Sequence, residues 1–169
     1  MAEAKTPTRK SGLNKSQSLE LASDCGKLST QVEMLCEFLD AIIKDDAQKE
    51  LIQIRDGFLR KYFELISKTL KKSSYEIRRV VLGETKIEGD DWQKLGRDSQ
   101  RLGFFSHNIL NLIETIIGET QDQKLKRLQE DYFKTCLLRA TGLLKMVSTG
   151  IRLNSFSDRK STLLNSSHD

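Results

Sequence analysis

Histidine is the side chain best suited to exchange a proton or accept a phosphoryl group near neutral pH, and the chain contains two. His107 lies inside a segment rich in apolar residues, whereas His168 is the penultimate residue. Neither has a histidine or cysteine partner at the spacing that holds a transition metal. His107 is therefore the histidine whose surroundings indicate chemistry, and acceptance of a phosphoryl group is the reaction to consider.

The residues around His107 give this hypothesis some support. The segment 104–109 reads FFSHNI, and a second amphipathic stretch follows it. Ser-His-Asn-Ile in a helical hairpin resembles the phospho-accepting box of sensor histidine kinases, which implies that His107 could be phosphorylated. The next segment, 110–112, lacks the arginine and proline of that box, and no glycine-rich ATP-binding segment follows. We therefore interpret His107 as a solvated histidine on a helix and keep a degenerate phosphotransfer-like bundle as an alternative.

A cluster of basic residues is the strongest charge feature of the sequence. Glu76 is the only acid within it, and Tyr75 is its only aromatic residue. Such a cluster is either a solvated helix face or a contact for an acidic protein or an anionic membrane surface. The net charge of +4 is small and aromatic residues are not interleaved, so there is no strong nucleic-acid signal. The cluster consists of Lys68, Lys71, Lys72, Arg78 and Arg79.

Motifs for catalysis are missing from the sequence. It contains no glycine-rich phosphate loop, nucleophile elbow or EF-hand loop. The acidic pairs Asp45-Asp46 and Asp90-Asp91 stand where helices are predicted to start, so we interpret both as helix caps. The Glu-x-x-His motifs of a di-iron bundle are also missing. The sequence therefore predicts a protein that is not an enzyme and has no cofactor or metal.

The cysteines and the hydropathy pattern predict the compartment. Cys25, Cys36 and Cys136 are odd in number, and each lies on or beside an apolar helical stripe. This favours reduced thiols over a disulfide framework. The N-terminal residues lack the apolar core of a secretory signal, and no run approaches the ~20 apolar residues of a membrane-spanning helix. We therefore expect a cytoplasmic or nuclear protein without a transmembrane segment.

Four amphipathic helices would position these residues. Segments 18–44, 46–82, 91–118 and 121–148 each carry apolar residues that alternate at spacings of three and four, the heptad pattern of packed helices. Each would be roughly 40 Å long, and short loops between them force antiparallel neighbours. The sequence thus predicts an all-α fold: an elongated, antiparallel up-down four-helix bundle spanning residues 18–148. In segment 91–118 the apolar seam comprises Leu95, Leu102, Phe105, Ile109, Leu112 and Ile116.

Three features inside the predicted helices concern their packing. Ser73 has the spacing of a helix cap with Glu76, but no glycine or proline interrupts residues 72–82, so we favour one continuous second helix. Trp92, at the start of the third helix, is predicted to plug one end of the bundle. Gly96 and Gly103 lie seven residues apart, which indicates either a close approach of two backbones or a weak point.

The two ends of the sequence are predicted to be disordered tails. Residues 1–17 are basic and polar, and residues 149–169 are rich in serine, asparagine and charge. Ile151, Leu153 and Phe156 could continue the helical seam for a turn or two. A phosphate in the first tail would offset much of its positive charge. The possible phosphoacceptors are Thr6, Ser11 and Ser161.

Long apolar seams without a catalytic constellation predict a non-catalytic interaction or scaffold module, part of a helical complex, which binds protein partners on its helix surfaces. A homo-oligomer stays open, because heptad seams can also be shared between chains. The alternatives are the phosphotransfer-like bundle using His107 and a binder of acidic partners or anionic membranes through residues 68–79. Truncation to alanine at seam positions is expected to cost about 2–5 kcal/mol each. The test positions are Leu35, Ile109 and Leu143.

Overall fold

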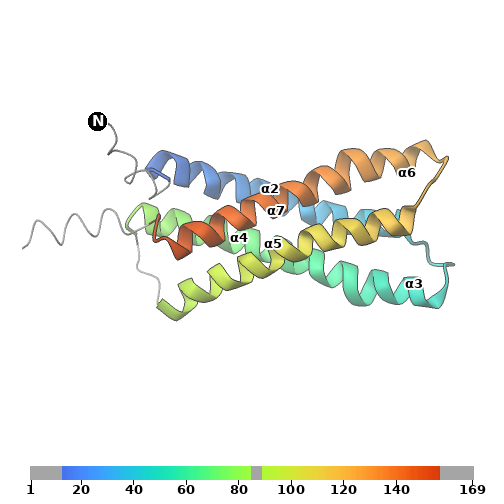
Figure 1. Ribbon diagram of the computed structural model, residues 1–169, viewed down its shortest axis with the longest axis horizontal. Coiled ribbons are helices and arrows are strands. Elements are labelled where there is room, and N and C mark those ends of the chain that lie inside the picture. The colour runs from blue at the N-terminus through green and yellow to red at the C-terminus, as the bar shows by residue number, and fades with distance from the viewer. Residues whose placement is uncertain (1–12, 85–88, 157–169) are drawn as a thin grey trace, which may run out of the picture.

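The computed structural model describes residues 13–84 and 89–156, which form an elongated bundle of four long helices (Figure 1). Successive helices run in opposite directions, and the part of the chain that the structure describes contains no strand. The prediction of an all-α, antiparallel up-down bundle is confirmed. The second and fourth helices each contain a π-helical segment between two α-helical ones. Each of these two helices therefore consists of three consecutive elements.

The first helix, α2 (Lys15–Ile42), begins before the predicted start at residue 18. The side chain of Asn14 accepts a hydrogen bond from the Gln17 backbone N–H at 2.8 Å, and the Asn14 N–H donates to the Gln17 side chain at 3.0 Å. This reciprocal cap satisfies two backbone donors that the helix itself leaves unpaired. Residues 15–17, which the composition assigned to a tail, therefore form the first turn of α2.

The second helix is continuous through three elements: α3 (Lys49–Ile54), the π-helical η2 (Arg55–Leu59) and α4 (Arg60–Val81). The prediction of one continuous second helix is confirmed as far as Val81, although this helix starts at Lys49 and not at residue 46, and Leu82 is its C-cap. Ser73 does not begin a helix, because its hydroxyl donates to the Thr69 carbonyl at 2.8 Å within α4. This bond satisfies the buried hydroxyl inside its own helix.

The third helix is α5 (Gly89–Ile117), which begins before the predicted residue 91, so that Asp90 and Asp91 lie inside its first turn and not ahead of it as the predicted cap. The fourth consists of α6 (Gln123–Arg127), the π-helical η3 (Leu128–Lys134) and α7 (Thr135–Arg152). It starts at Asp122, whose side chain accepts from the Lys124 N–H at 2.9 Å. The helix thus starts later and ends later than the predicted segment 121–148.

The C-terminal boundary differs most from the prediction. Residues 149–152 are helical, and Ile151 and Phe156 are buried against the bundle. The region assigned to a tail from residue 149 is therefore part of the fold as far as residue 156. The proposed phosphoacceptors Thr6, Ser11 and Ser161 lie outside the described residues.

The bundle is built from two hairpins, because α2 lies closest along α4 and α5 closest along α7 (Figure 1). In the first hairpin two buried serines face each other. The Ser29 hydroxyl donates to the Ser67 carbonyl at 2.9 Å, and the Ser67 hydroxyl donates to the Ser29 carbonyl at 3.0 Å. Side chains this small let the two backbones approach until these bonds form.

Glycines serve the same purpose in the second hairpin. A Cβ atom at Gly103 would lie 3.4 Å from the Cβ of Leu144, and one at Gly96 would lie 3.1 Å from Cγ2 of Ile151. Both glycines are buried on the face of α5 that packs on α7. Their seven-residue spacing therefore marks a close approach of two helices, the first of the two interpretations left open by the sequence.

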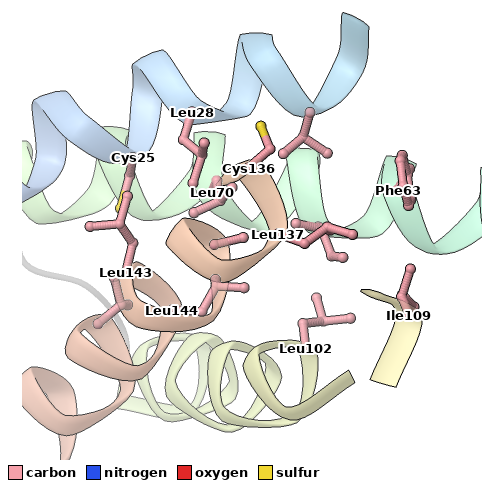
Figure 2. Close-up of a cluster of buried hydrophobic side chains, with 14 of the residues drawn as sticks. Cys25, Leu28, Phe63, Leu70, Leu102, Ile109, Cys136, Leu137, Leu143 and Leu144 are labelled. Atoms are coloured by element: carbon pink, nitrogen blue, oxygen red, sulfur yellow. The ribbon is translucent and has the colours of Figure 1, made fainter. Parts of the chain in front are cut away.

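The core fills the space between the hairpins with leucine, isoleucine and phenylalanine side chains, several of which converge around Leu137 (Figure 2). Phe63 of α4 and Phe133 of η3 are fully buried, with ring centroids 6.0 Å apart. The three test positions of the seam are buried within the single chain, with exposed fractions of 2%, 1% and 8% for Leu35, Ile109 and Leu143.

All three cysteines are free thiols, in agreement with the prediction. Cys25 and Cys136 are buried in the core, and Cys36 is half-buried. Burial disfavours the charged thiolate, so the pKa of Cys25 rises to about 12 and that of Cys136 to about 11. The thiols of Cys25 and Cys136 are therefore protonated and unreactive in the folded protein at neutral pH.

Trp92 is buried in the first turn of α5, as its predicted role as an end plug requires. Its ring meets that of Phe156 edge-on, with centroids 6.0 Å apart and planes at 76°. Phe156 in turn lies over Gly150 of α7, where the absence of a side chain leaves room for the ring. One aromatic pair thus fastens the residues after α7 to the start of α5.

Candidate functional site: the groove between α5 and α7

The basic cluster predicted from the sequence forms one side of α4. Lys68, Lys71, Lys72 and Arg78 are exposed, and Arg79 is half-buried. Acidic residues offset part of this charge, because Lys71 lies 3.9 Å from Glu33 and Arg79 lies 3.7 Å from Glu76. The Arg79 guanidinium also lies over the ring of Tyr75, 4.9 Å from its centroid. The cluster is a solvated helix face with partly paired charges.

His107 is exposed on α5, and the structure places it at a different site from the basic cluster. It lines a groove of about 800 Å³ between α5 and α7. The groove also receives basic side chains that no sequence motif connects with His107. None of the five cluster residues on α4 is among those that line it. The basic residues of the groove are Arg97, Arg101, Lys145 and Arg152.

The helix pairing explains how these residues meet. Arg97, Arg101 and Phe104 follow one another at spacings of four and three, which places them on one side of α5. Lys145 and Arg152 lie seven residues apart and share a side of α7. The contacts of Gly96 with Ile151 and of Gly103 with Leu144 set the two helices antiparallel and in register. Two basic rims therefore face the same groove.

The bottom and wall of the groove are uncharged. Gly103 lines it and leaves the α7 backbone close, since a Cβ there would lie 3.6 Å from the Thr141 carbonyl oxygen and 3.8 Å from the Lys145 nitrogen. Phe104 stands beside it with 71% of its surface exposed, the most exposed of the large apolar side chains in the described chain. An exposed aromatic ring next to a hollow is typical of a surface that binds a partner.

The electrostatic character of the groove is positive. Among the residues that the structure describes, no carboxylate lines it. Asp98 of α5 pairs with Lys94 at 2.8 Å and with the groove residue Arg101 at 3.8 Å. Within the described residues, Arg97, Lys145 and Arg152 form no ion pair, so their charges face solvent. The groove thus favours an anionic ligand that also has an apolar part.

The sequence contains a partial signal for this groove, which does not suffice without knowledge of how the helices pair. The basic residues recur at helical spacings on each of two helices. Nothing in the sequence states which sides of those helices adjoin, or that Gly103 lies between them. A pattern search that pairs antiparallel helices through their small residues would have brought Arg101 and Lys145 together.

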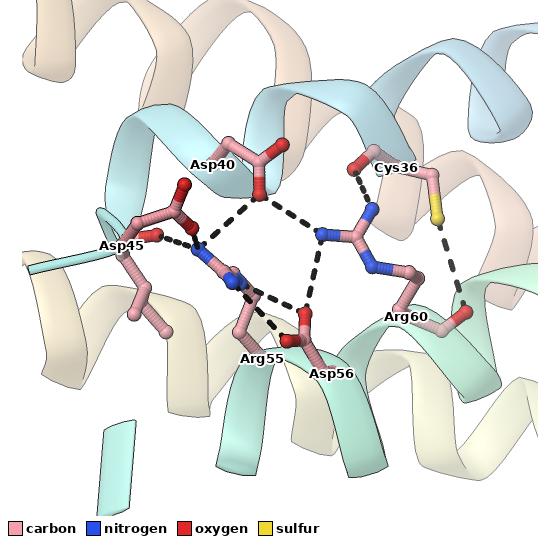
Figure 3. A network of polar contacts seen from close by, with 7 residues as sticks. Cys36, Asp40, Asp45, Arg55, Asp56 and Arg60 are labelled. Atoms are coloured by element: carbon pink, nitrogen blue, oxygen red, sulfur yellow. Dashed lines mark hydrogen bonds and ion pairs between the residues drawn. The ribbon is translucent and has the colours of Figure 1, made fainter. Parts of the chain in front are cut away.

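A second polar cluster surrounds Arg55 (Figure 3). The Arg55 side chain is 7% exposed, and its Nη1 donates to the Ile43 carbonyl at 2.8 Å. Nη1 also lies 2.9 Å from a carboxylate oxygen of Asp45 and 3.3 Å from one of Asp40, and Nε lies 2.8 Å from Asp56. Arg55 therefore joins the end of α2 to the π-helical η2.

Arg60 completes the cluster by bridging Asp40 at 3.0 Å and Asp56 at 3.4 Å, and it also donates to the Cys36 carbonyl at 3.2 Å. These bonds pair the two arginines with three carboxylates and two backbone carbonyls, so the cluster fastens the end of α2 to the second helix. The predicted cap at Asp45-Asp46 is corrected here, because the N-cap of α3 is Gln48 and Asp45 instead pairs with Arg55.

The pKa of Asp56 is lowered, chiefly by its hydrogen bonds from Arg55. A carboxyl with a lowered pKa stabilises the fold above its ordinary pKa, and this contribution disappears as pH falls through the lowered value. We expect Asp56→Asn to be less stable than the natural chain at pH 7, and the difference to shrink as pH falls below about 4. Urea denaturation across this pH range measures it.

Glu130→Gln is a suitable control, because Glu130 has only an exposed pair with Lys134 at 3.7 Å. Its effect should be small at every pH. A difference between the natural chain and Asp56→Asn that stays constant down to about pH 3 would contradict the assigned role of Arg55.

Comparison with protein-family models, with curated proteins and with solved structures finds no match to this chain. Two further findings concern the described residues. No group of three or more His, Cys, Asp or Glu side chains there is arranged to hold a metal ion. No helix there combines the length and apolar character needed to cross a membrane. The class of the protein is therefore given by its fold, a four-helix bundle with a basic groove.

Proposed function

We propose that this chain is a non-catalytic interaction module, a scaffold or subunit of a helical complex that binds a segment of a partner protein in the groove between α5 and α7. The observation that carries this proposal is Phe104, exposed beside a hollow that is bordered by basic residues from two helices. We place its activity in the cytoplasm or nucleus, where the three free cysteines would stay reduced.

The burial of the core supports a role for the outer surface. All four helices contribute buried apolar residues to one core within a single chain, and further seam residues such as Phe105 and Leu112 pack partly buried against it. Their apolar stripes therefore need no second chain to cover them, and a partner would meet the outside of the bundle. Burying an exposed phenylalanine contributes about 1.5–3 kcal/mol, so Phe104 would be a strong anchor for such a partner.

The test is a selection from displayed random peptides of about ten residues, the length of helix that the groove accommodates. We expect selected peptides to bind the natural chain and to bind Phe104→Ala at least about tenfold more weakly. The control is Leu138→Ala, which removes an apolar side chain on α7 that is 44% exposed and lies outside the groove. Failure to select any peptide, or equal binding to Phe104→Ala, would refute the proposal.

A second candidate function is phosphotransfer through His107. The observation that favours it is the exposure of this imidazole in a groove whose basic residues could hold a phosphate. Incubation with acetyl phosphate tests it, since a phosphohistidine is labile to acid. Acid-labile phosphate on the natural chain that is lost in His107→Gln would replace the scaffold proposal with this one.

A third candidate is the basic cluster on α4, as a contact for an acidic partner or an anionic membrane surface. Its exposure favours it, but the ion pairs of Lys71 and Arg79 offset part of its charge. Charge reversal at Lys72 and Arg78, both exposed, should abolish any salt-sensitive binding to anionic vesicles. Binding that ignores both salt and charge reversal excludes this candidate.

A further inference from the structure

We infer that the segment bound between α5 and α7 is an acidic amphipathic helix of a partner protein, with carboxylates toward the two basic rims and an apolar residue toward Phe104. The inference rests on the proposed function and adds the chemistry of the partner. Its basis is the combination of charge, length and shape that the groove presents.

The length of the groove fits a short helix. From Arg97 to His107, α5 advances about 15 Å, and from Thr141 to Arg152, α7 advances about 16 Å, at 1.5 Å per residue. A helix of about ten residues has the same length. An acidic partner helix laid along the groove would make a three-helix contact in which the new helix spans both rims.

The charges of the groove match acidic side chains at helical spacing. The contact of Gly96 with Ile151 places the neighbouring residues Arg97 and Arg152 at one end of the groove. The contact of Gly103 with the Lys145 backbone places Lys145 near the middle. A guanidinium pairs with a carboxylate through two parallel hydrogen bonds, which gives orientation as well as attraction. Glutamates three or four residues apart on a partner helix could therefore meet both rims.

The apolar part of the groove distinguishes a peptide from a membrane. Phe104 and Gly103 line a hollow between two helices, and a flat lipid surface reaches a hollow less well than a narrow helix does. A phosphate alone would leave the exposed face of Phe104 uncovered. An amphipathic helix suits both the exposed ring of Phe104 and the two basic rims, because one apolar side chain covers the ring while neighbouring acidic side chains reach the rims.

The experiment measures fluorescence anisotropy of a labelled helical peptide of about ten residues that carries glutamates and one phenylalanine on a single face. The matched peptide has glutamine in place of every glutamate. The test variant is Arg101→Glu with Lys145→Glu, whose side chains are both exposed. The control is Lys71→Glu with Lys72→Glu on α4, which changes the net charge equally. Circular dichroism and Trp92 emission confirm that each variant is folded.

At an ionic strength of about 0.01 M, where screening acts over about 30 Å, the acidic peptide should bind the natural chain. We expect binding to weaken at least about tenfold in the groove variant and with the glutamine peptide, and to change less than about threefold in the α4 variant. Equal weakening by the two charge reversals would mean attraction to net charge alone, and would overturn the inference.

Three further outcomes are decisive. If displayed peptides bind through Phe104 but are neutral or basic, or ignore the reversal of Arg101 and Lys145, the inference fails and the proposed function stands. If vesicles containing phosphatidylserine bind through these two residues and the acidic peptide does not bind, a membrane is the partner and the inference fails. If no peptide of any composition binds, the proposed function itself fails.

Discussion

Replacement of Leu137 by alanine is expected to lower the free energy of unfolding by about 2–5 kcal/mol. Leu137 is fully buried in α7, where residues of both hairpins surround it (Figure 2). Its removal takes away apolar contacts and leaves a cavity that a rigid bundle fills only in part. Urea denaturation followed by circular dichroism measures the loss.

The neighbouring Leu138 provides the control. It has the same side chain on the same helix, but it is 44% exposed. Leu138→Ala should therefore change stability by less than about 1 kcal/mol, as surface substitutions usually do. The same reasoning supports the expected losses at Leu35, Ile109 and Leu143, which the structure places in the core. Losses of less than about 1 kcal/mol at Leu137 and these three positions would show that the core is assigned incorrectly.

Gly150→Ala is expected to destabilise the protein, although alanine is the better helix former. A Cβ atom at this position would lie 2.3 Å from Cζ of Phe156, so the ring must leave its place. The displacement should cost about 1–3 kcal/mol, more than the roughly 1 kcal/mol that alanine contributes to an exposed helix. Trp92 would lose its edge-on partner and become more exposed, so its emission should shift to longer wavelength.

Gly142→Ala on the same helix should have the opposite effect. Gly142 is exposed, and no atom lies within 4 Å of a Cβ built there. We expect this substitution to stabilise the protein by about 0.4–1 kcal/mol without changing Trp92 emission. Trp92 is the only tryptophan of the chain, so the emission reports on this one site. If both glycine substitutions stabilise the protein and neither shifts the emission, Phe156 does not hold the position described.

The helices were predictable because each buries a regular apolar stripe. The second helix shows the limit of this approach, since its sequence offers two adjacent apolar rows. The structure buries Leu59 and Phe63 from one row, while Leu65 from the other is 38% exposed. Periodicity alone could not choose between them, because the choice depends on how α4 is rotated against its neighbours.

Local signals failed where a distant residue offered a stronger interaction. Aspartate is a common N-cap residue, but the carboxylate of Asp45 pairs instead with the buried Arg55. The sequence after residue 148 is mostly polar, yet Phe156 packs over Gly150 and against Trp92. The groove was missed for a different reason, because its two rims lie on helices whose pairing is a property of the folded chain.

The division of the bundle into two hairpins has a kinetic consequence. Each hairpin joins helices that follow one another closely in sequence, so its formation closes only a short loop and costs little chain entropy. Chains with such local contacts fold quickly, and docking of the hairpins through Phe63 and Phe133 would come last. A ligand held by α5 and α7 alone would act within one hairpin. The bound ligand would slow local opening of the α5–α7 hairpin directly. It would slow opening of the α2–α4 hairpin only through the core that the two hairpins share.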